Sequence, residues 1–350
     1  MSKKVLIILL LGVIYFTGST LNDAGTFKSV KDDFNGEVVT IYEQMAGTED
    51  LDIDRESGLL FISSSDRWTI RSGGEASGDG IYTLQLDSGL APKKLITDFN
   101  QPLHPHGISF FKQDGESFLY IINHIESGSS VELFKYTDSQ LKHQNSFSDE
   151  MMCCPNDLVG VDIETFYVTN DHGNESGIMR TLEDYLKIPS SYLLYYDGKS
   201  FAKAYEDLNY ANGVALSIDG KHLYLTHTTG RELLSFNRNS ETGFLEIESS
   251  LNLGTGVDNI SVDDKGEIWI GAHPKLFSFV EHSGDPSKKS PSEILRITHH
   301  GPTSFGVERV YSNSGNQISG SSVAVRYKDE LFVGAVFESK LLRARMNANH

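Results

Sequence analysis

The sequence contains a strand-like segment with a central aromatic residue that recurs six times, at a mean interval of about 54 residues. Each copy follows a second apolar stretch, and a turn rich in Asp and Gly often joins the two. The central aromatic residues are Phe61, Tyr120, Tyr167, Tyr224, Trp269 and Phe332. Short strands repeated at this period are typical of a β-propeller, in which each repeat forms one four-stranded blade. The sequence therefore predicts an all-β fold, a six-bladed β-propeller.

The ends of the repeat array indicate how the ring closes. The last repeat ends soon after Arg343, about one strand short of a full blade. The apolar segment 37–43 precedes the first repeat and is free to supply that strand, which would leave no sheet edge open. We therefore expect ring closure by the N-terminal strand and a single catalytic domain over residues 23–350. Amphipathic segments are expected as third strands of the blades, for example 80–85, 131–136 and 275–279.

The N-terminus has the pattern of a targeting segment. Lys3 and Lys4 precede an apolar run from Val5 to Phe16. This run is too short to span a bilayer as a helix, but it has the length of the apolar region of a signal peptide. Residues 1–22 are therefore expected to be a signal peptide or a hydrophobic N-terminal anchor. The protein would then be exported, secreted or periplasmic, or held at a membrane or lipid surface by an uncleaved N-terminus.

The charge balance limits the classes of partner. Lys and Arg number 30 against 48 Asp and Glu, which gives a net charge of −18. This argues against binding to nucleic acid or electrostatic attachment to anionic lipid. The adjacent residues Cys153 and Cys154 cannot form a disulfide scaffold and lack the spacing of zinc ligands, so packing is their simplest interpretation.

Polar residues open the first strand of each predicted blade, which is the strand that lines the central channel of a propeller. They are Glu49, Asp50, His106, Asn156, Asp157, Asn212, Asp258, Asn259, Ser321 and Ser322. A single Asn-Gly or Asn-Asp pair would mark only a turn, but five such groups at equivalent repeat positions indicate a shared site. Buried carboxylates need a partner or a metal ion. Oxygen ligands from Glu, Asp and Asn suit calcium, whereas zinc prefers His or Cys.

Histidine forms a second set of candidate residues. His106 and His124 belong to consecutive strands of the second repeat, so they could face each other at one end of the channel. Such a pair can supply a general base near neutral pH. His172 and His273 also follow aromatic strands, where they line the same pocket or cap the strand ends. The sequence has no G-x-S-x-G elbow, convincing phosphate loop or C-x-x-C motif, so a hydrolase of this kind would use water activated by metal and base.

At these residues the chain resembles the serum paraoxonase/arylesterase family of calcium-dependent lactonases. The resemblance covers about residues 37–343. The matching strings include Pro105-His-Gly-Ile-Ser109, Phe166-Tyr-Val-Thr-Asn-Asp-His172, Tyr210-Ala-Asn-Gly213 and Val257-Asp-Asn-Ile-Ser-Val-Asp263. The resemblance implies a six-bladed propeller that hydrolyses lactones and aryl or carboxylic esters, with phosphotriester cleavage as a side activity.

The resemblance also implies roles for individual residues and two calcium ions. A catalytic calcium would be held by Glu49, Asn156, Asn212, Asp258 and Asn259. A structural calcium would be held by Asp50, Asp157 and the backbone carbonyl of Ile108. His106 would take a proton from the attacking water, oriented by His124, and Asp171, His172 and His273 match further pocket positions.

The sequence departs from the family pattern in two places. The disulfide that joins the two ends in animal members has no counterpart, and segments 67–79 and 174–189 need not match the family's lid. Two other functions also remain as alternatives. One alternative is a gluconolactonase-type propeller with a single metal. The other is a non-enzymatic extracellular propeller that binds a protein partner. In the favoured interpretation the partner is a small-molecule lactone or ester.

Overall fold

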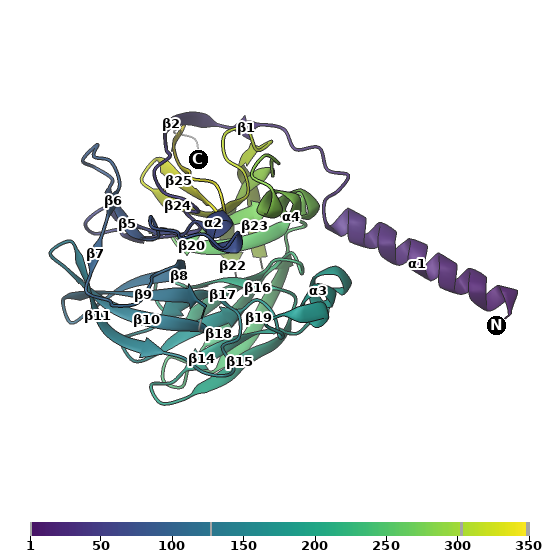
Figure 1. Ribbon diagram of the computed structural model, residues 1–350, viewed down its shortest axis with the longest axis horizontal. Helices are drawn as coiled ribbons and strands as arrows, with labels where there is room; N and C mark the ends of the chain where they lie inside the picture. Colours follow the sequence, from purple (N-terminus) through teal and green to yellow (C-terminus); the bar gives the residue numbers. More distant parts are fainter. Residues whose placement is uncertain (1, 127, 302–303, 348–350) are drawn as a thin grey trace.

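The computed structural model describes residues 2–126, 128–301 and 304–347, and the strands in these ranges form six sheets arranged around a central axis (Figure 1). The first blade consists of β3 (Asp50–Asp54), β4 (Leu59–Ser64), β5 (Gly80–Gln85) and β6 (Lys93–Lys94). The second consists of β8 (Pro105–Gln113), β9 (Glu116–Ile125), β10 (Gly128–Thr137) and β11 (Gln140–Phe147), with β7 (Ile96–Thr97) at its edge. The third consists of β12 (Pro155–Gly160), β13 (Phe166–Asn170), β14 (Ser191–Tyr196) and β15 (Phe201–Leu208).

The remaining blades complete the ring. The fourth consists of β16 (Ala211–Leu216), β17 (His222–His227), β18 (Glu232–Arg238) and β19 (Leu245–Asn252). The fifth consists of β20 (Gly256–Val262), β21 (Ile268–His273), β22 (Ser292–Gly301) and β23 (Ser304–Asn313), with β1 (Asp33–Phe34) at its edge. The sixth consists of β24 (Ser321–Tyr327), β25 (Glu330–Ala335), β26 (Leu341–Met346) and β2 (Gly36–Tyr42). The predicted six-bladed propeller is confirmed.

The ring closes as the sequence predicts. Strand β2, from the N-terminal part of the chain, pairs antiparallel with β26, and the register runs from Glu37 opposite Arg345 to Tyr42 opposite Leu341. The sixth blade therefore combines both ends of the chain. This pairing protects the edge of β26 and joins the first repeat to the last without a covalent link.

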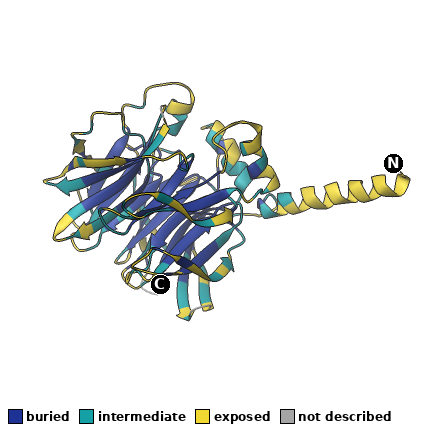
Figure 2. Ribbon diagram, turned by 90° about the horizontal axis from the view of Figure 1, so that it is seen from below, coloured by how far each residue is buried: buried dark blue, intermediate teal, exposed yellow. Residues whose placement is uncertain are grey.

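The repeated aromatic residues lie on the second strand of each blade and fill the space between blades. Five of them have no exposed surface, and Tyr224 is 5% exposed. Tyr120, for example, packs against Phe166 of the next blade with ring centroids 5.0 Å apart. The dark interior of the strands in Figure 2 shows that the core lies within and between the sheets.

Irregularities in the innermost strands explain how neighbouring polar side chains reach the channel. Five of the six described innermost strands have a register shift near their first residues, at 105–108, 155–158, 211–214, 257–260 and 321–323. A β-bulge of this kind redirects consecutive side chains. Glycines allow the strands to pack closely there: a Cβ on Gly107 would lie 2.6 Å from Asp157 Cα, and one on Gly213 would lie 2.7 Å from Asp258 O.

Three helices interrupt the blades on the side where the channel opens. They are α2 (Arg67–Arg71), α3 (Gly177–Leu186) and α4 (Leu276–Gly284). Each follows the second strand of its blade, in blades one, three and five. The expected third strand at 275–279 is therefore wrong, because this segment starts α4 and the third strand is β22. The apolar residues Leu276, Phe277, Phe279 and Val280 have helical rather than alternating spacing, which explains the difference.

Helix α1 (Lys3–Asp23) projects away from the propeller (Figures 1 and 2). It has 21 residues, none of them buried, and in the described part of the chain it is the one helix long and apolar enough to cross a membrane. The helix is longer than the apolar run identified in the sequence, because it continues through the small and polar residues up to Asp23. Its end is fixed to the propeller: Asp23 forms ion pairs with Lys187 at 2.5 Å and Arg231 at 2.9 Å.

Candidate active site

A cavity of about 750 Å³ opens at one end of the channel, between α2, α3, α4 and the end of α1. A concave site at the point where the repeats converge is the usual location for ligand binding. Nine predicted site residues line it: Glu49, His106, His124, Asn156, Asp171, His172, Asn212, Asp258 and His273. Asp50, Asp157, Ile108 and Asn259 are buried and do not line the cavity.

The two histidines of the second blade face each other, as the sequence predicts. Nδ1 of His106 lies 2.9 Å from Nε2 of His124, and Nδ1 of His124 lies 2.8 Å from the hydroxyl of Ser129. Burial lowers the pKa of His124 to about 3, and the positive charges of His106 and Arg67 act in the same direction. His124 is therefore neutral near pH 7 and can orient His106 without becoming charged.

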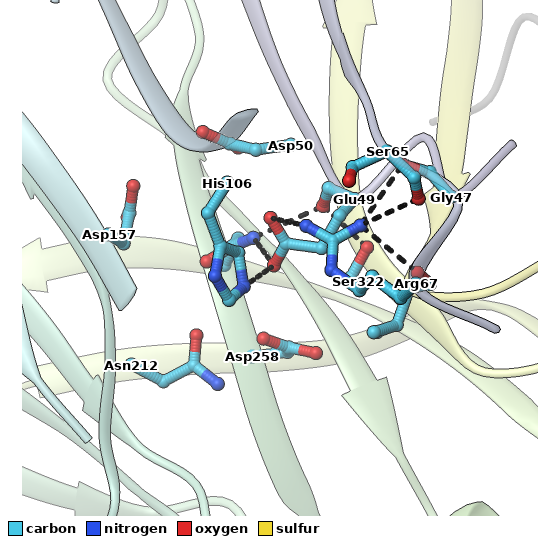
Figure 3. Close-up of polar contacts among 12 residues, drawn as sticks. Gly47, Glu49, Asp50, Ser65, Arg67, His106, Asp157, Asn212, Asp258 and Ser322 are labelled. Carbon is cyan, nitrogen blue, oxygen red and sulfur yellow. Dashed lines mark hydrogen bonds and ion pairs between the residues drawn. The ribbon is translucent and has the colours of Figure 1, made fainter. Parts of the chain in front are cut away.

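Glu49 lies immediately before β3 and is 1% exposed. Its Oε1 accepts a hydrogen bond from Asn259 Nδ2 at 2.7 Å and lies 3.5 Å from His106 Nε2. Arg67 on α2 approaches Oε2 at 3.8 Å (Figure 3). Burial disfavours the charge of Glu49, but His106, Arg67 and Asn259 together hold its pKa below its usual value. The channel therefore contains a buried, ionised carboxylate.

Four buried side-chain oxygens at this place accept no hydrogen bond. They are Glu49 Oε2, Asn156 Oδ1, Asn212 Oδ1 and Asn259 Oδ1. The amide of Asn212 donates to Thr228 Oγ1 at 3.0 Å and that of Asn259 to Glu49, so the nitrogen ends are satisfied while the oxygen ends are not. Buried acceptors without donors are costly, and several together fit a hard cation with oxygen ligands. These residues are therefore suited to hold calcium.

Asp258 adds a second carboxylate to the same space. Figure 3 shows Glu49, Asn212 and Asp258 around His106. Asp258 Oδ2 lies 2.7 Å from His273 Nε2, and the His273 ring stacks on Phe279 of α4 with centroids 3.8 Å apart. Burial raises the pKa of Asp258, and the interaction with His273 opposes this shift. His273 thus holds Asp258 in position from the wall of the cavity.

In the described ranges, no group of three or more His, Cys, Asp and Glu side chains is arranged to hold a metal ion. This agrees with the composition of the oxygen set, in which carboxamides supply three of the four unpaired atoms. The two serines at the start of β24 are not part of that set. Ser322 donates its hydroxyl to the carbonyl of Glu49 at 2.5 Å, and Ser321 bonds to the backbone, so both position strands rather than face a ligand.

Asp50 and Asp157 form a separate buried acidic pair. Each accepts two backbone amides: Asp50 from Leu51 at 2.8 Å and Ile108 at 2.7 Å, and Asp157 from Leu158 and Val214, both at 2.8 Å. Burial raises the pKa of both carboxyls well above the usual value; repulsion from Asp157 adds to the shift of Asp50. Neither acid forms an ion pair with a basic side chain of the described residues, and two such buried acids fit a second cation. The Ile108 contact runs through its amide, and the ligand role of its carbonyl stays a prediction.

Asp171 and His172 follow β13 and lie in the wall of the cavity. His172 Nδ1 lies 2.6 Å from Asp171 Oδ1 and its Nε2 lies 3.1 Å from Asp184 Oδ1 on α3. Burial disfavours the charged ring, but the hydrogen bonds to both carboxylates outweigh it and raise the pKa of His172 to about 9. His172 is thus a positive ring that connects α3 to the propeller.

Three arginines of the cavity were not identified from the sequence. Arg67 and Arg71 belong to α2, and Arg180 belongs to α3. The four-residue spacing of Arg67 and Arg71, which is one helical turn, was the available sequence signal for α2. The composition of segment 67–79, rich in Gly and Ser, instead indicates a loop. Cys153 and Cys154 also line the cavity as free cysteines, one half-buried and one buried.

The fold and the cavity define a six-bladed β-propeller with an oxygen-lined pocket and a histidine pair at one end of its channel. The profile of the family described as Arylesterase matches residues 91–343. Human serum paraoxonase/arylesterase 1 is 33% identical over 312 residues, which cover 84% of this chain and 85% of that protein. Serum paraoxonase/arylesterase 2 of Gallus gallus is 33% identical over 308 residues, with 84% and 85% covered. The chain belongs to the arylesterase family and is a hydrolase of the paraoxonase/arylesterase group.

Solved structures show the same fold at low sequence identity. A gluconolactonase of Xanthomonas campestris matches with a TM-score of 0.54 at 15% identity, covering 91% of this chain and 97% of that chain. This likeness extends to the architecture of the propeller alone.

Proposed function

We propose that the protein is a calcium-dependent hydrolase of lactones and of aryl and carboxylic esters. The observation that supports this most is the set of four buried oxygens that accept no hydrogen bond, beside the His106–His124 pair. Candidate ligands for a hard cation therefore lie beside an imidazole pair, which is the combination that hydrolysis by activated water requires. Phosphotriester cleavage is included as a side activity of the same site.

Two calcium ions are proposed. The ligands of the catalytic ion are Glu49, Asn156, Asn212, Asp258 and Asn259, and those of the structural ion are Asp50, Asp157 and the carbonyl of Ile108. When bound, the catalytic ion would polarise the substrate carbonyl and offset the charge that develops on its oxygen. The buried acids of both sets support this assignment, because each carboxylate would then face a positive charge.

The histidine pair would handle the proton of the attacking water. Two tautomeric arrangements of a neutral His124 fit these contacts. In the one that leaves His106 able to accept a proton at the channel, His124 Nδ1–H donates to Ser129 and His124 Nε2 accepts from His106 Nδ1–H. This leaves the lone pair of His106 Nε2 directed toward the channel, 3.5 Å from Glu49 Oε1. His106 would accept the proton there, and the Glu49 carboxylate would stabilise the resulting imidazolium.

Helix α1 is proposed to act as a signal sequence or as an uncleaved N-terminal anchor. Its length, its apolar composition and the exposure of the apolar residues from Val5 to Phe16 support this role. The propeller would then be exported, either secreted or periplasmic, or held at a membrane surface next to the cavity, whose rim includes Asp23 and Ala24.

The test is a hydrolysis screen of the full chain with phenyl acetate, γ-lactones and δ-lactones, in wild type and His106→Gln. Turnover of lactones and aryl ester by wild type, with strongly reduced turnover by the variant, is expected. A protein without activity on any of these substrates would favour a propeller that binds a partner. A gluconolactonase-type enzyme would instead contain one metal ion per chain, which metal analysis of the purified protein distinguishes from two.

A further inference from the structure

Three arginine side chains line the cavity, although the protein as a whole carries a net charge of −18. Arg67 and Arg71 are one turn apart on α2, and Arg180 lies on α3. Their bonding differs. Arg67 approaches Glu49 and donates to the carbonyls of neighbouring loops, including those of Gly47 and Val336, so its guanidinium is used within the protein (Figure 3).

Arg71 has no such partner. It donates to the carbonyl of Ser283 at 3.3 Å, and its guanidinium lies 4.8 Å from the centroid of Phe337. Among the described carboxylates none forms an ion pair with Arg71. The ring contact and the single hydrogen bond orient the guanidinium toward the cavity but leave most of its five N–H donors free for a ligand.

Arg180 supplies a second cation on the facing helix. It lies 3.5 Å from Asp171, and it donates to the carbonyl of Glu175 at 3.2 Å and to Cys154 Sγ at 3.3 Å. Burial lowers the pKa of Arg71, and the positive charge of Arg180 acts in the same direction. Two cations that repel each other across a cavity are stabilised when an anion binds between them.

Among the described acids of the cavity, Asp171 forms an ion pair with Arg180, and none forms one with Arg71. Apart from the exposed Glu175, the acids that line the cavity each have a basic partner. These pairs are Glu49 with His106, Asp23 with Lys187, Asp171 and Asp184 with His172, and Asp258 with His273. The positive charge of Arg71 is therefore locally uncompensated, and a site of this kind attracts anions even on an acidic protein.

We propose that Arg71 and Arg180 form a subsite for an anionic group on the substrate, distant from the bond that is hydrolysed. The preferred substrates would be lactones or esters that carry a carboxylate or a phosphate monoester on their side chain. This rests on the proposed hydrolase function and specifies its substrate class. The planar fork of each guanidinium matches two oxygens of either group.

The test compares kcat/KM for three γ-lactones with the same side chain, which ends in a carboxylate, a phosphate monoester or a methyl ester. We expect at least one anionic substrate to exceed the methyl ester by about ten-fold, the usual scale of one charge-assisted contact. Arg71→Met should reduce this ratio to about one. Arg309→Met is the matched control, because it removes the same charge from an exposed position outside the cavity and should keep the ratio.

A preference for the methyl ester, equal rates for all three, or an unchanged ratio in Arg71→Met would overturn the inference. Calorimetric titration with glutarate and with inorganic phosphate distinguishes failure of the anion subsite from failure of the hydrolase function. Binding that is lost in Arg71→Met but kept in Arg309→Met supports the subsite even if no lactone is hydrolysed. Absence of binding to wild type, together with equal rates, contradicts the subsite alone.

Discussion

Asp50 and Asp52 on β3 provide a matched pair for testing the structural calcium. Both carboxylates accept two backbone amides, one from the next residue and one from the second blade: Leu51 and Ile108 for Asp50, and Ile53 and Phe110 for Asp52. Only Asp50 faces a second buried acid, Asp157, and only Asp50 is a proposed ligand. Asp50→Asn and Asp52→Asn therefore lose similar hydrogen bonds but differ in their relation to calcium.

The expected magnitudes follow from this geometry. Each Asn retains one acceptor oxygen, so in each variant one backbone N–H faces the side-chain NH2 group and loses its hydrogen bond, at a cost of about 1–2 kcal/mol. In EGTA, Asp50→Asn recovers part of that loss, because it removes the repulsion that raises the pKa of Asp50 and Asp157. In calcium at about 1,000 times the Kd, one site adds about 4 kcal/mol to wild type and to Asp52→Asn. Asp50→Asn should lack most of this gain.

The assay is thermal unfolding of wild type and both variants, each in EGTA and in saturating calcium. We expect the structural ion to contribute on the order of 5–10 °C to the calcium-induced rise in Tm of wild type and Asp52→Asn. Asp50→Asn should lack this contribution and keep only the rise that comes from the catalytic ion. An equal calcium shift in both variants would refute the reasoning. Loss of the shift in Asp52→Asn alone would refute it equally.

Three further experiments test other parts of the structure. His106→Gln should lower kcat/KM for lactones by about 100-fold or more while leaving the calcium-induced Tm shift intact, measured by kinetics and thermal unfolding. His172 has a folded pKa of about 9 against 6.5, so its contribution to stability is complete below about pH 6.5 and is lost as the pH rises through 9. The difference in unfolding free energy between wild type and His172→Gln should therefore shrink from pH 6 to pH 10; a constant difference contradicts this ion pair. Ile41→Asp places a charge against the core beneath β2 and should lower the free energy of unfolding in urea by about 2–4 kcal/mol. Val39→Asp, on the exposed face of the same strand, should lower it by under about 1 kcal/mol. Equal losses of stability in the two variants would contradict ring closure by β2.

The fold was predictable because one feature repeats. The aromatic residue of each second strand fills the gap between two blades, so its recurrence gives the number of blades and the phase of every innermost strand. The same phase brings Glu49, Asn212 and Asp258 to one axis although they are far apart in the sequence. Closure by β2 followed from the missing strand after Arg343.

The insertions between strands were harder to predict, because they do not repeat. In the segment that forms α4, Phe277 and Phe279 are two residues apart as in a strand, and only the addition of Leu276 and Val280 shows the helical spacing. The contact of this helix with the cavity, where Phe279 stacks on His273, is not visible in the sequence. Helix α2 is only five residues long, and its position next to Glu49 is set by contacts with other blades. The identity of the arginines facing the cavity therefore comes from tertiary structure.

The bonding of the site likewise depends on atomic detail. The sequence indicates oxygen ligands but not which atoms lack donors, and Asn212 shows the difference: its amide nitrogen is held by Thr228 while its oxygen has no donor. Ser322 is excluded from the candidate ligands because its hydroxyl donates to the carbonyl of Glu49, which the sequence does not show. Such distinctions require the bulged strands that aim adjacent side chains differently.

Calcium dependence of hydrolysis tests the central claim most directly. Phenyl acetate and a γ-lactone are assayed with wild-type protein stripped by EGTA, and calcium is then titrated back while bound ions are counted. We expect activity to fall to background in EGTA, to return with calcium, and to reach its maximum near two ions per chain. Full activity in calcium-free EGTA would contradict the account.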